Sequence, residues 1–196
     1  MITFMAVTAY QQQLRDRFLA APVVAPPPPW QPVGGGLIPV GGLLGIGFAT
    51  DPATGHDLVL TVSSSGHGLF DAVTGEKIER DYDPEEEPYG PDLSCPGIGP
   101  VADVRIPVAG LYGGGLHTHA DGGWHVEVLT PEWPNERVLL CTGRGPFEGG
   151  HGENWWHVYH SSWSTFRAAG FSPSGRTLAV ATSSDLTLWT RAGTGG

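Results

Sequence analysis

Two histidines one residue apart, His117 and His119, are the residues of this sequence best placed for metal chemistry. Alternate residues of a β-strand project from the same face, so a strand here would bring both imidazoles within reach of one metal ion. Asp121 and His125 follow shortly afterwards. We therefore predict His117, His119 and His125 as candidate ligands of a divalent metal. The alternative is that these histidines belong to a glycine-rich loop that begins with residues 113–115.

A second histidine-rich segment, residues 151–160, also contains the tryptophan pair Trp155 and Trp156. It lacks the His-Glu-x-x-His spacing of zinc enzymes. Tryptophans beside polar groups are common in recognition surfaces, so both are candidate protein-binding residues. The alternative is that each tryptophan fills the core.

The segment over residues 76–92 carries eight carboxylates, two bases, three prolines and two tyrosines. Prolines and like charges favour an exposed loop with little secondary structure. Such a loop is either simply solvated or forms a contact surface for a basic partner, with the tyrosines as aromatic anchors. The candidate contact residues are Tyr82, Glu85, Glu86, Glu87 and Tyr89.

Familiar catalytic motifs are missing from the sequence. The segment 170–174 lacks the final glycine of a nucleophile elbow, and the glycine-rich stretches lack the Lys-Ser/Thr ending of a phosphate loop. Neither Cys95 nor Cys141 lies in a recognisable catalytic context. We therefore assign no catalytic residue.

Charge narrows the range of partners. The chain has 20 acidic residues against 10 lysines and arginines, a formal net charge of −10. Nucleic acids are bound by clustered cations, so this excess predicts no nucleic-acid partner and favours a basic protein. A second interpretation is that the charge only maintains solubility. The sequence also predicts no membrane span and no secretory signal, and two unpaired thiols suit a reducing cytoplasm.

The frame that holds these residues is predicted to be all-β. The 30 glycines and 18 prolines interrupt any long helix, except over residues 6–21, where Tyr10, Leu14 and Phe18 recur at helical spacing. Four consecutive prolines then form a stiff spacer. We predict a helix and spacer over residues 1–33 and a β domain over residues 34–196. Its antiparallel sheets are expected to be propeller-like or sandwich-like, with the one helix at the N-terminus.

Near the C-terminus, an aromatic-Ser-Pro-Ser-Gly turn precedes a strand of small residues, and a later strand ends in tryptophan. This unit resembles a WD-repeat blade. Ser174 replaces the aspartate usual in that family, and no aspartate follows the tryptophan. The residues on the pattern are Phe171, Ser172, Pro173, Gly175, Leu178, Asp185 and Trp189.

Residues 48–75 look like a looser copy of this unit, with Phe48 and Phe70 in the equivalent aromatic places. The interval between the copies is long enough for further blades of ~40–45 residues. Few residues follow the last strand, so an N-terminal strand over residues 2–7 or 37–40 would supply its outer neighbour. The resemblance covers a third of the chain and implies a rigid frame that presents loops.

Together these observations predict a non-catalytic protein-binding module of a bacterial cytoplasm, such as an immunity or inhibitor protein that blocks a basic partner. One alternative is a metal-dependent enzyme or metal-binding protein that uses the His-x-His pair. Another is a structural subunit of a larger assembly, with the N-terminal helix and proline tract as its docking arm. The oligomeric state stays open.

Overall fold

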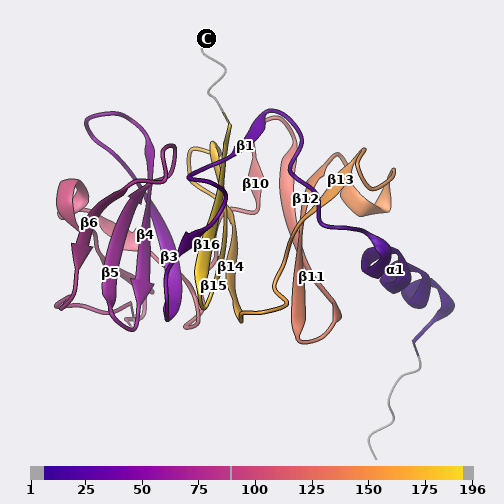
Figure 1. Cartoon of the computed structure of the whole chain (residues 1–196), viewed down its shortest axis with the longest axis horizontal. Coiled ribbons are helices and arrows are strands. Elements are labelled where there is room, and N and C mark those ends of the chain that lie inside the picture. The colour runs from indigo at the N-terminus through magenta and orange to yellow at the C-terminus, as the bar shows by residue number, and fades with distance from the viewer. Residues whose placement is uncertain (1–6, 89, 192–196) are drawn as a thin grey trace, which may run out of the picture.

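The computed structural model describes residues 7–88 and 90–191, which are mostly β-strands with a single α-helix near the N-terminus. Three antiparallel sheets stand side by side in one row (Figure 1). We call them the first, central and third sheets, in their order along the row. The predicted all-β class with one N-terminal helix is thereby confirmed. In the described part of the chain, no helix has the length and apolar character needed to cross a membrane.

The first sheet is built around β4 (Asp57–Ser63), a strand buried on both faces. Leu58 and Leu60 belong to one hydrophobic cluster and Val59 to another, because successive side chains point to opposite faces. This double burial explains the unbroken apolar sequence of the strand. The strand order is β6-β5-β4-β3-β9, with β3 (Leu43–Thr50), β5 (Gly66–Asp71), β6 (Lys77–Asp81) and β9 (Ala109–Gly110).

The central sheet contains a second strand buried on both faces, β15 (Thr177–Thr182). Ala179 and Ala181 pack in the cluster shared with the first sheet, whereas Leu178 and Val180 pack in the cluster shared with the third. The sheet is ordered β1-β16-β15-β14, and β2 also pairs with β16. The other strands are β1 (Trp30–Pro32), β2 (Ile38–Pro39), β14 (Phe166–Phe171) and β16 (Asp185–Arg191).

The third sheet is covered on its outer face by the helix α1 (Ala9–Ala20), at one end of the row (Figure 1). Phe18 is buried against Trp155, with the ring centroids 5.7 Å apart and nearly perpendicular. Leu14 is half-buried and Tyr10 is exposed. The predicted helix is therefore confirmed, and it docks on the body of the protein. The sheet is ordered β10-β11-β12-β13, with β10 (His119–Ala120), β11 (Trp124–Glu132), β12 (Asn135–Thr142) and β13 (Trp155–His160).

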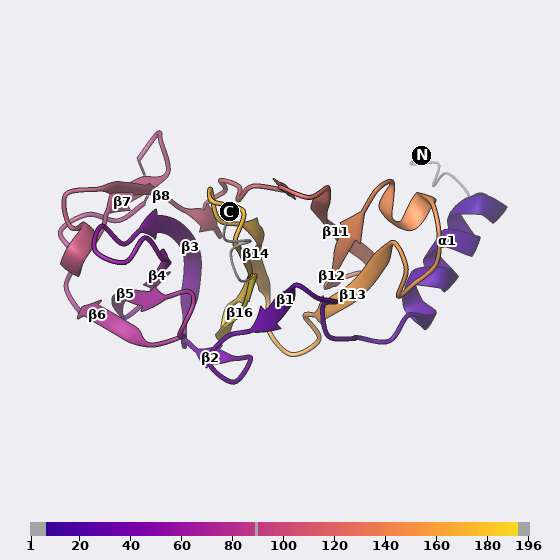
Figure 2. The same ribbon diagram turned by 90° about the horizontal axis from the view of Figure 1, so that it is seen from above.

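At the other end of the row, the hairpin of β7 (Ser94–Pro96) and β8 (Arg105–Pro107) covers the first sheet (Figure 2). The short 3-10 helix η1 (Gly99–Val101) lies between these strands, and a second one, η2 (Gly145–Phe147), follows β12. Cys95, Val101 and Ile106 are buried against the leucines of β4. Both outer faces of the row are thus capped, which keeps their apolar side chains from water.

The N-terminal part of the chain completes the central sheet. β1 pairs with the end of β16 and β2 with its beginning, both antiparallel. The predicted outer strand over residues 37–40 is thereby confirmed at Ile38 and Pro39, whereas the other candidate, residues 2–7, lies almost entirely outside the described residues. The boundary predicted at residue 33, between the N-terminal segment and the β domain, falls between β1 and β2, which belong to the same sheet.

The two units predicted as repeats are both runs of antiparallel strands, β3 to β6 and β14 to β16, and β1 takes the outer place in the second. Three strands of the central sheet, β14 to β16, come last in the chain, but the sheet lies between the other two (Figure 1). Among the described residues, hydrophobic clusters join the first sheet to the central sheet and the central to the third. The sheets thus form a row, and the likeness to WD-repeat blades stays a prediction.

Candidate functional site

The described residues of the acidic segment, 76–88 and 90–92, belong to β6 and to the loop that leads from it to β7 (Figure 2). Glu85 and Glu86 are exposed, and the side chain of Tyr82 is 79% exposed. The predicted exposed loop is confirmed at these positions. Tyr89, the second predicted anchor, lies outside the described residues.

A pocket of about 150 Å³ opens beside this loop, and we call it the acidic pocket. Carboxylates surround one buried imidazole, that of His67 on β5, which is only 1% exposed. Burial lowers the pKa of His67 from 6.5, so the ring is neutral at physiological pH and does not offset the negative charge. The pocket is lined by His67, Asp81, Pro84, Glu85, Glu86, Pro96, Gly97 and Ile98.

Glu87 meets His67 next to this pocket without forming a hydrogen bond. The Glu87 Oε2 and His67 Nε2 atoms are 3.9 Å apart, which is beyond hydrogen-bonding distance. Both atoms are buried, and neither has a hydrogen-bond partner in the described part of the chain. Leaving a buried polar atom unpaired costs about 1–3 kcal/mol, so such atoms are rare without a reason. Both atoms are closed to solvent, so the contact belongs to the packing beside the pocket, and the polar atoms open to a ligand are those of the lining carboxylates.

The start of β5 explains how the chain brings these groups together. Gly66 has a φ of +104°, and a Cβ at this position would lie 2.1 Å from the carbonyl oxygen of Asp81. Only glycine permits this close approach of β5 to the end of β6. The approach sets His67, the next residue, opposite Asp81 in the strand register.

The cations near the pocket do not neutralise it. Arg105 of β8 donates from Nη1 to Glu86 Oε2 at 2.8 Å, and its Nε lies 3.9 Å from Asp92 Oδ2. These side chains are about half exposed, so solvent screening limits the contribution of each ion pair to stability to about 0–1 kcal/mol. Within the segment itself, only two cationic residues, Lys77 and Arg80, accompany the eight carboxylates. A cationic group with several N–H donors, an ammonium or a guanidinium, is the ligand chemistry that the pocket suits.

The predicted metal ligands are brought together only in part. His119 and His125 are register partners on β10 and β11, and their rings stack with centroids 5.7 Å apart. His117 is exposed, and its carbonyl oxygen accepts a hydrogen bond from the N–H of Phe171. Among the described residues, no three His, Cys, Asp or Glu side chains are grouped to hold a metal ion. The assignment of these histidines to a metal stays a prediction.

The two predicted contact tryptophans do not lie on an open surface. Trp155 is 1% exposed and packs against α1, which confirms the core interpretation for this residue. Trp156 is half-buried and packs on Trp124 with ring centroids 5.9 Å apart. Side chains of consecutive strand residues point to opposite faces, so one tryptophan faces the helix and the other the central sheet.

Sequence reasoning missed two exposed tryptophans. Trp133 is 83% exposed in the β11–β12 turn, and Trp163 is 97% exposed in the β13–β14 turn. Both turns lie at the same end of the third sheet, where the N–H of Ser161 donates to the carbonyl oxygen of Glu136. The available signal was their position beside Pro and Ser, which places them in turns beyond the strand ends.

No family model, curated protein or solved structure matches this chain. The functional assignment therefore depends on the geometry of its own residues.

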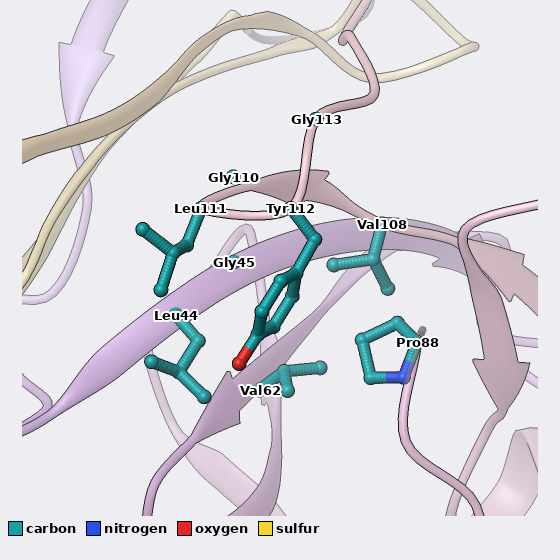
Figure 3. A pocket seen from close by; sticks show the side chains of 9 residues that line it. All are labelled: Leu44, Gly45, Val62, Pro88, Val108, Gly110, Leu111, Tyr112 and Gly113. Carbon is teal, nitrogen blue, oxygen red and sulfur yellow. The ribbon is translucent and has the colours of Figure 1, made fainter. Parts of the chain in front are cut away.

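A separate small cavity beside β3 carries no ligand site (Figure 3). Tyr112 lies among Leu44, Val62, Val108 and Pro88, which gives the cavity an apolar lining. Its volume is about 10 Å³, which is room for about one water molecule. It is a packing feature within the first sheet, between β3 and the segment that follows β9.

Proposed function

We propose that this protein is a binding module for a basic protein partner, which it contacts through the acidic pocket and the loop beside it. The supporting observation is the cluster of carboxylates, Asp81, Glu85 and Glu86, in the lining of the pocket, with Glu87 next to its buried His67. An arginine or lysine side chain of the partner would enter the pocket. Its N–H groups would bond to the carboxylates of Glu85, Glu86 and Glu87.

The net charge of −10 supports the same partner class at longer range. A negative field accelerates the encounter with a basic protein and weakens as ionic strength rises. Tyr82 follows the pocket residue Asp81 in the chain, and its ring centroid lies 5.0 Å from the Arg80 guanidinium carbon. Its exposed surface supplies an aromatic contact of the kind common in interfaces. An immunity or inhibitor protein that blocks a basic enzyme is a function of this type.

A triple variant, Glu85→Gln, Glu86→Gln and Glu87→Gln, tests the proposal. The matched control removes three carboxylates elsewhere, with the substitutions Asp121→Asn, Glu132→Gln and Glu148→Gln, all at exposed positions. Each protein would be used as bait in an extract of the native host at low and high salt, and the retained proteins identified and quantified.

We expect the wild type and the control to retain the same stoichiometric basic protein and the pocket variant to lose it. The affinity should also fall as salt is added. Equal retention by the two triple variants, or no stoichiometric basic protein on the wild-type bait, contradicts the proposal. The metal-site and assembly-subunit hypotheses stay predictions of the sequence.

A further inference from the structure

A second cleft lies between the first and central sheets, away from the acidic pocket. Its lining contains two arginines, whereas that of the acidic pocket is rich in carboxylates. Its volume is about 410 Å³, within the range of about 300–1,000 Å³ typical of small-molecule sites. Arg176, Arg191 and His56 line it together with Asp57, Gln31 and Thr190. We call it the arginine cleft.

Two copies of the same turn, at residues 51–55 and 71–75, adjoin the arginine cleft: the first ends next to His56 and the second contributes Val73 to the lining. In each copy the first residue is aspartate, and its carbonyl oxygen accepts a hydrogen bond at 2.8 Å from the N–H of the closing glycine. These glycines, Gly55 and Gly75, have φ values of +70° and +79°, which other residues rarely adopt. Asp51 and Asp71 also accept hydrogen bonds from backbone N–H groups of their own turns. Each turn is therefore closed by its own hydrogen bonds.

The two guanidinium groups are held in place by neutral carbonyl oxygens. Arg176 Nη2 donates to Gly55 at 2.8 Å, and Arg191 Nε donates to Gly175 at 2.9 Å. Arg191 Nη1 also donates to Asp121 at 2.6 Å, and its guanidinium lies 5.4 Å from the centroid of the Trp30 ring. A guanidinium has five N–H donors, so most donors of both groups are left for other partners.

Neither arginine has a carboxylate partner within ion-pair distance among the described residues, although acids outnumber bases two to one in this chain. Among the described residues that line the cleft, Asp57 is the one carboxylate, and its Oδ2 accepts hydrogen bonds from three hydroxyl groups of the central sheet. Two guanidiniums that lack an ion-pair partner, in a cleft of this size, can offer their remaining N–H donors to an anion.

His56 adds a third polar group whose orientation is fixed. Its Nδ1 lies 2.8 Å from Asp71 Oδ2. Burial pushes the pKa of Asp71 upward, but the hydrogen bonds from His56 and from backbone N–H groups outweigh this effect, and the pKa is lowered from 3.8. Asp71 is therefore ionised at neutral pH. It holds the imidazole ring at the rim of the cleft.

We propose that the arginine cleft binds a small-molecule oxyanion, a phosphate monoester or a polycarboxylate, between Arg176 and Arg191. The planar fork of N–H donors on each guanidinium matches the paired oxygens of either group. Gln31 and Thr190 supply neutral polar contacts for the rest of the ligand.

Titration of the full chain with inorganic phosphate, and separately with citrate, tests this proposal by calorimetry or by amide chemical shifts. We expect saturable binding of at least one of the two probes, and comparison of the arms tells whether the site prefers phosphate or carboxylate. Arg176→Gln should weaken that binding by at least about tenfold, because it removes charged hydrogen bonds. Arg144→Gln, at an exposed arginine outside the cleft, should bind as the wild type does.

Arg176→Lys is the second variant, because it keeps the charge but loses the planar fork of N–H donors. Its affinity for the probe should lie between those of the wild type and the glutamine variant. Circular dichroism establishes that each variant is folded. The glutamine triple variant of the acidic pocket should bind the probes normally, which separates this proposal from the proposed function. No saturable binding of either probe up to about 10 mM, or equal affinities for Arg176→Gln and Arg144→Gln, overturns it.

Discussion

Asp57 joins two of the sheets, and its removal gives the sharpest test of how the row is held together. The carboxylate is 3% exposed, and Oδ2 accepts hydrogen bonds from Ser172 at 2.8 Å, Ser174 at 2.7 Å and Thr177 at 2.8 Å. The donors lie on the central sheet and its β14–β15 turn, whereas Asp57 begins β4 of the first sheet. The substitution Asp57→Ala removes all three bonds together.

The expected loss follows from the kind of bond. A hydrogen bond to a charged acceptor contributes about 1.5–3 kcal/mol to stability, and contributions within one network are not additive. Counting the three bonds as about two independent ones gives a loss of about 3–6 kcal/mol for Asp57→Ala. The same substitution at the exposed Asp103 should change stability by less than about 0.5 kcal/mol.

Urea unfolding followed by tryptophan fluorescence measures these free energies. The decisive comparison repeats Asp57→Ala in a chain that already carries Ser172→Ala and Ser174→Ala. Two of the three donors are then gone, and the cost of Asp57→Ala should fall by at least about 2 kcal/mol. If the cost is the same in both backgrounds, the hydroxyl network is not what stabilises this junction, and the reasoning is refuted.

Three further predictions follow from buried groups. Phe18→Ala should lower the free energy of unfolding by about 3 kcal/mol and release α1 from the third sheet, and a loss below about 1 kcal/mol in urea unfolding would show that the helix contributes little. Burial raises the pKa of Cys95 to about 11 and that of Cys141 to about 12, so thiol reagents should modify neither in the folded protein and both in urea; rapid native labelling would contradict this. Burial lowers the pKa of His67 and of His157 from 6.5, so the unfolded chain binds more protons below that pH. Stability should therefore be constant above about pH 7.5 and fall as the pH drops through 6.5 toward the folded-state pKa values, and a rise over the same range would be the opposite result.

The fold class could be predicted from the sequence because it depends on local signals. Glycine and proline turns separate the short apolar runs, and the helical spacing of Leu14 and Phe18 identifies the one helix. The order of the sheets could not be predicted in this way. It depends on which faces of β4 and β15 are buried against which neighbour, and a strand buried on both faces has the same apolar sequence whatever its neighbours are.

The acidic segment could also be found from the sequence, since its charge and prolines are contiguous. The acidic pocket could not, because His67 is separated from Glu87 along the chain and meets it only through the close approach at Gly66. The arginine cleft was missed for the same reason. Arg176 and Arg191 meet residues of the first sheet that lie more than a hundred positions earlier in the chain. The recurrence of the Asp-x-x-Thr-Gly turn beside those residues was the one signal of the cleft in the sequence.

The capped row of sheets explains why both candidate sites lie at strand ends and loops. Each face of the central sheet packs on a neighbouring sheet, and the outer faces are covered by α1 and by the β7–β8 hairpin. The apolar residues of these packed faces are buried. Polar side chains that need water or a ligand must therefore lie where strands end, and this is where the carboxylates around His67 and the guanidiniums beside Asp57 lie. A packing that uses the sheet faces for stability leaves the loops free to differ in charge, so one protein can present an anionic and a cationic site at separate places.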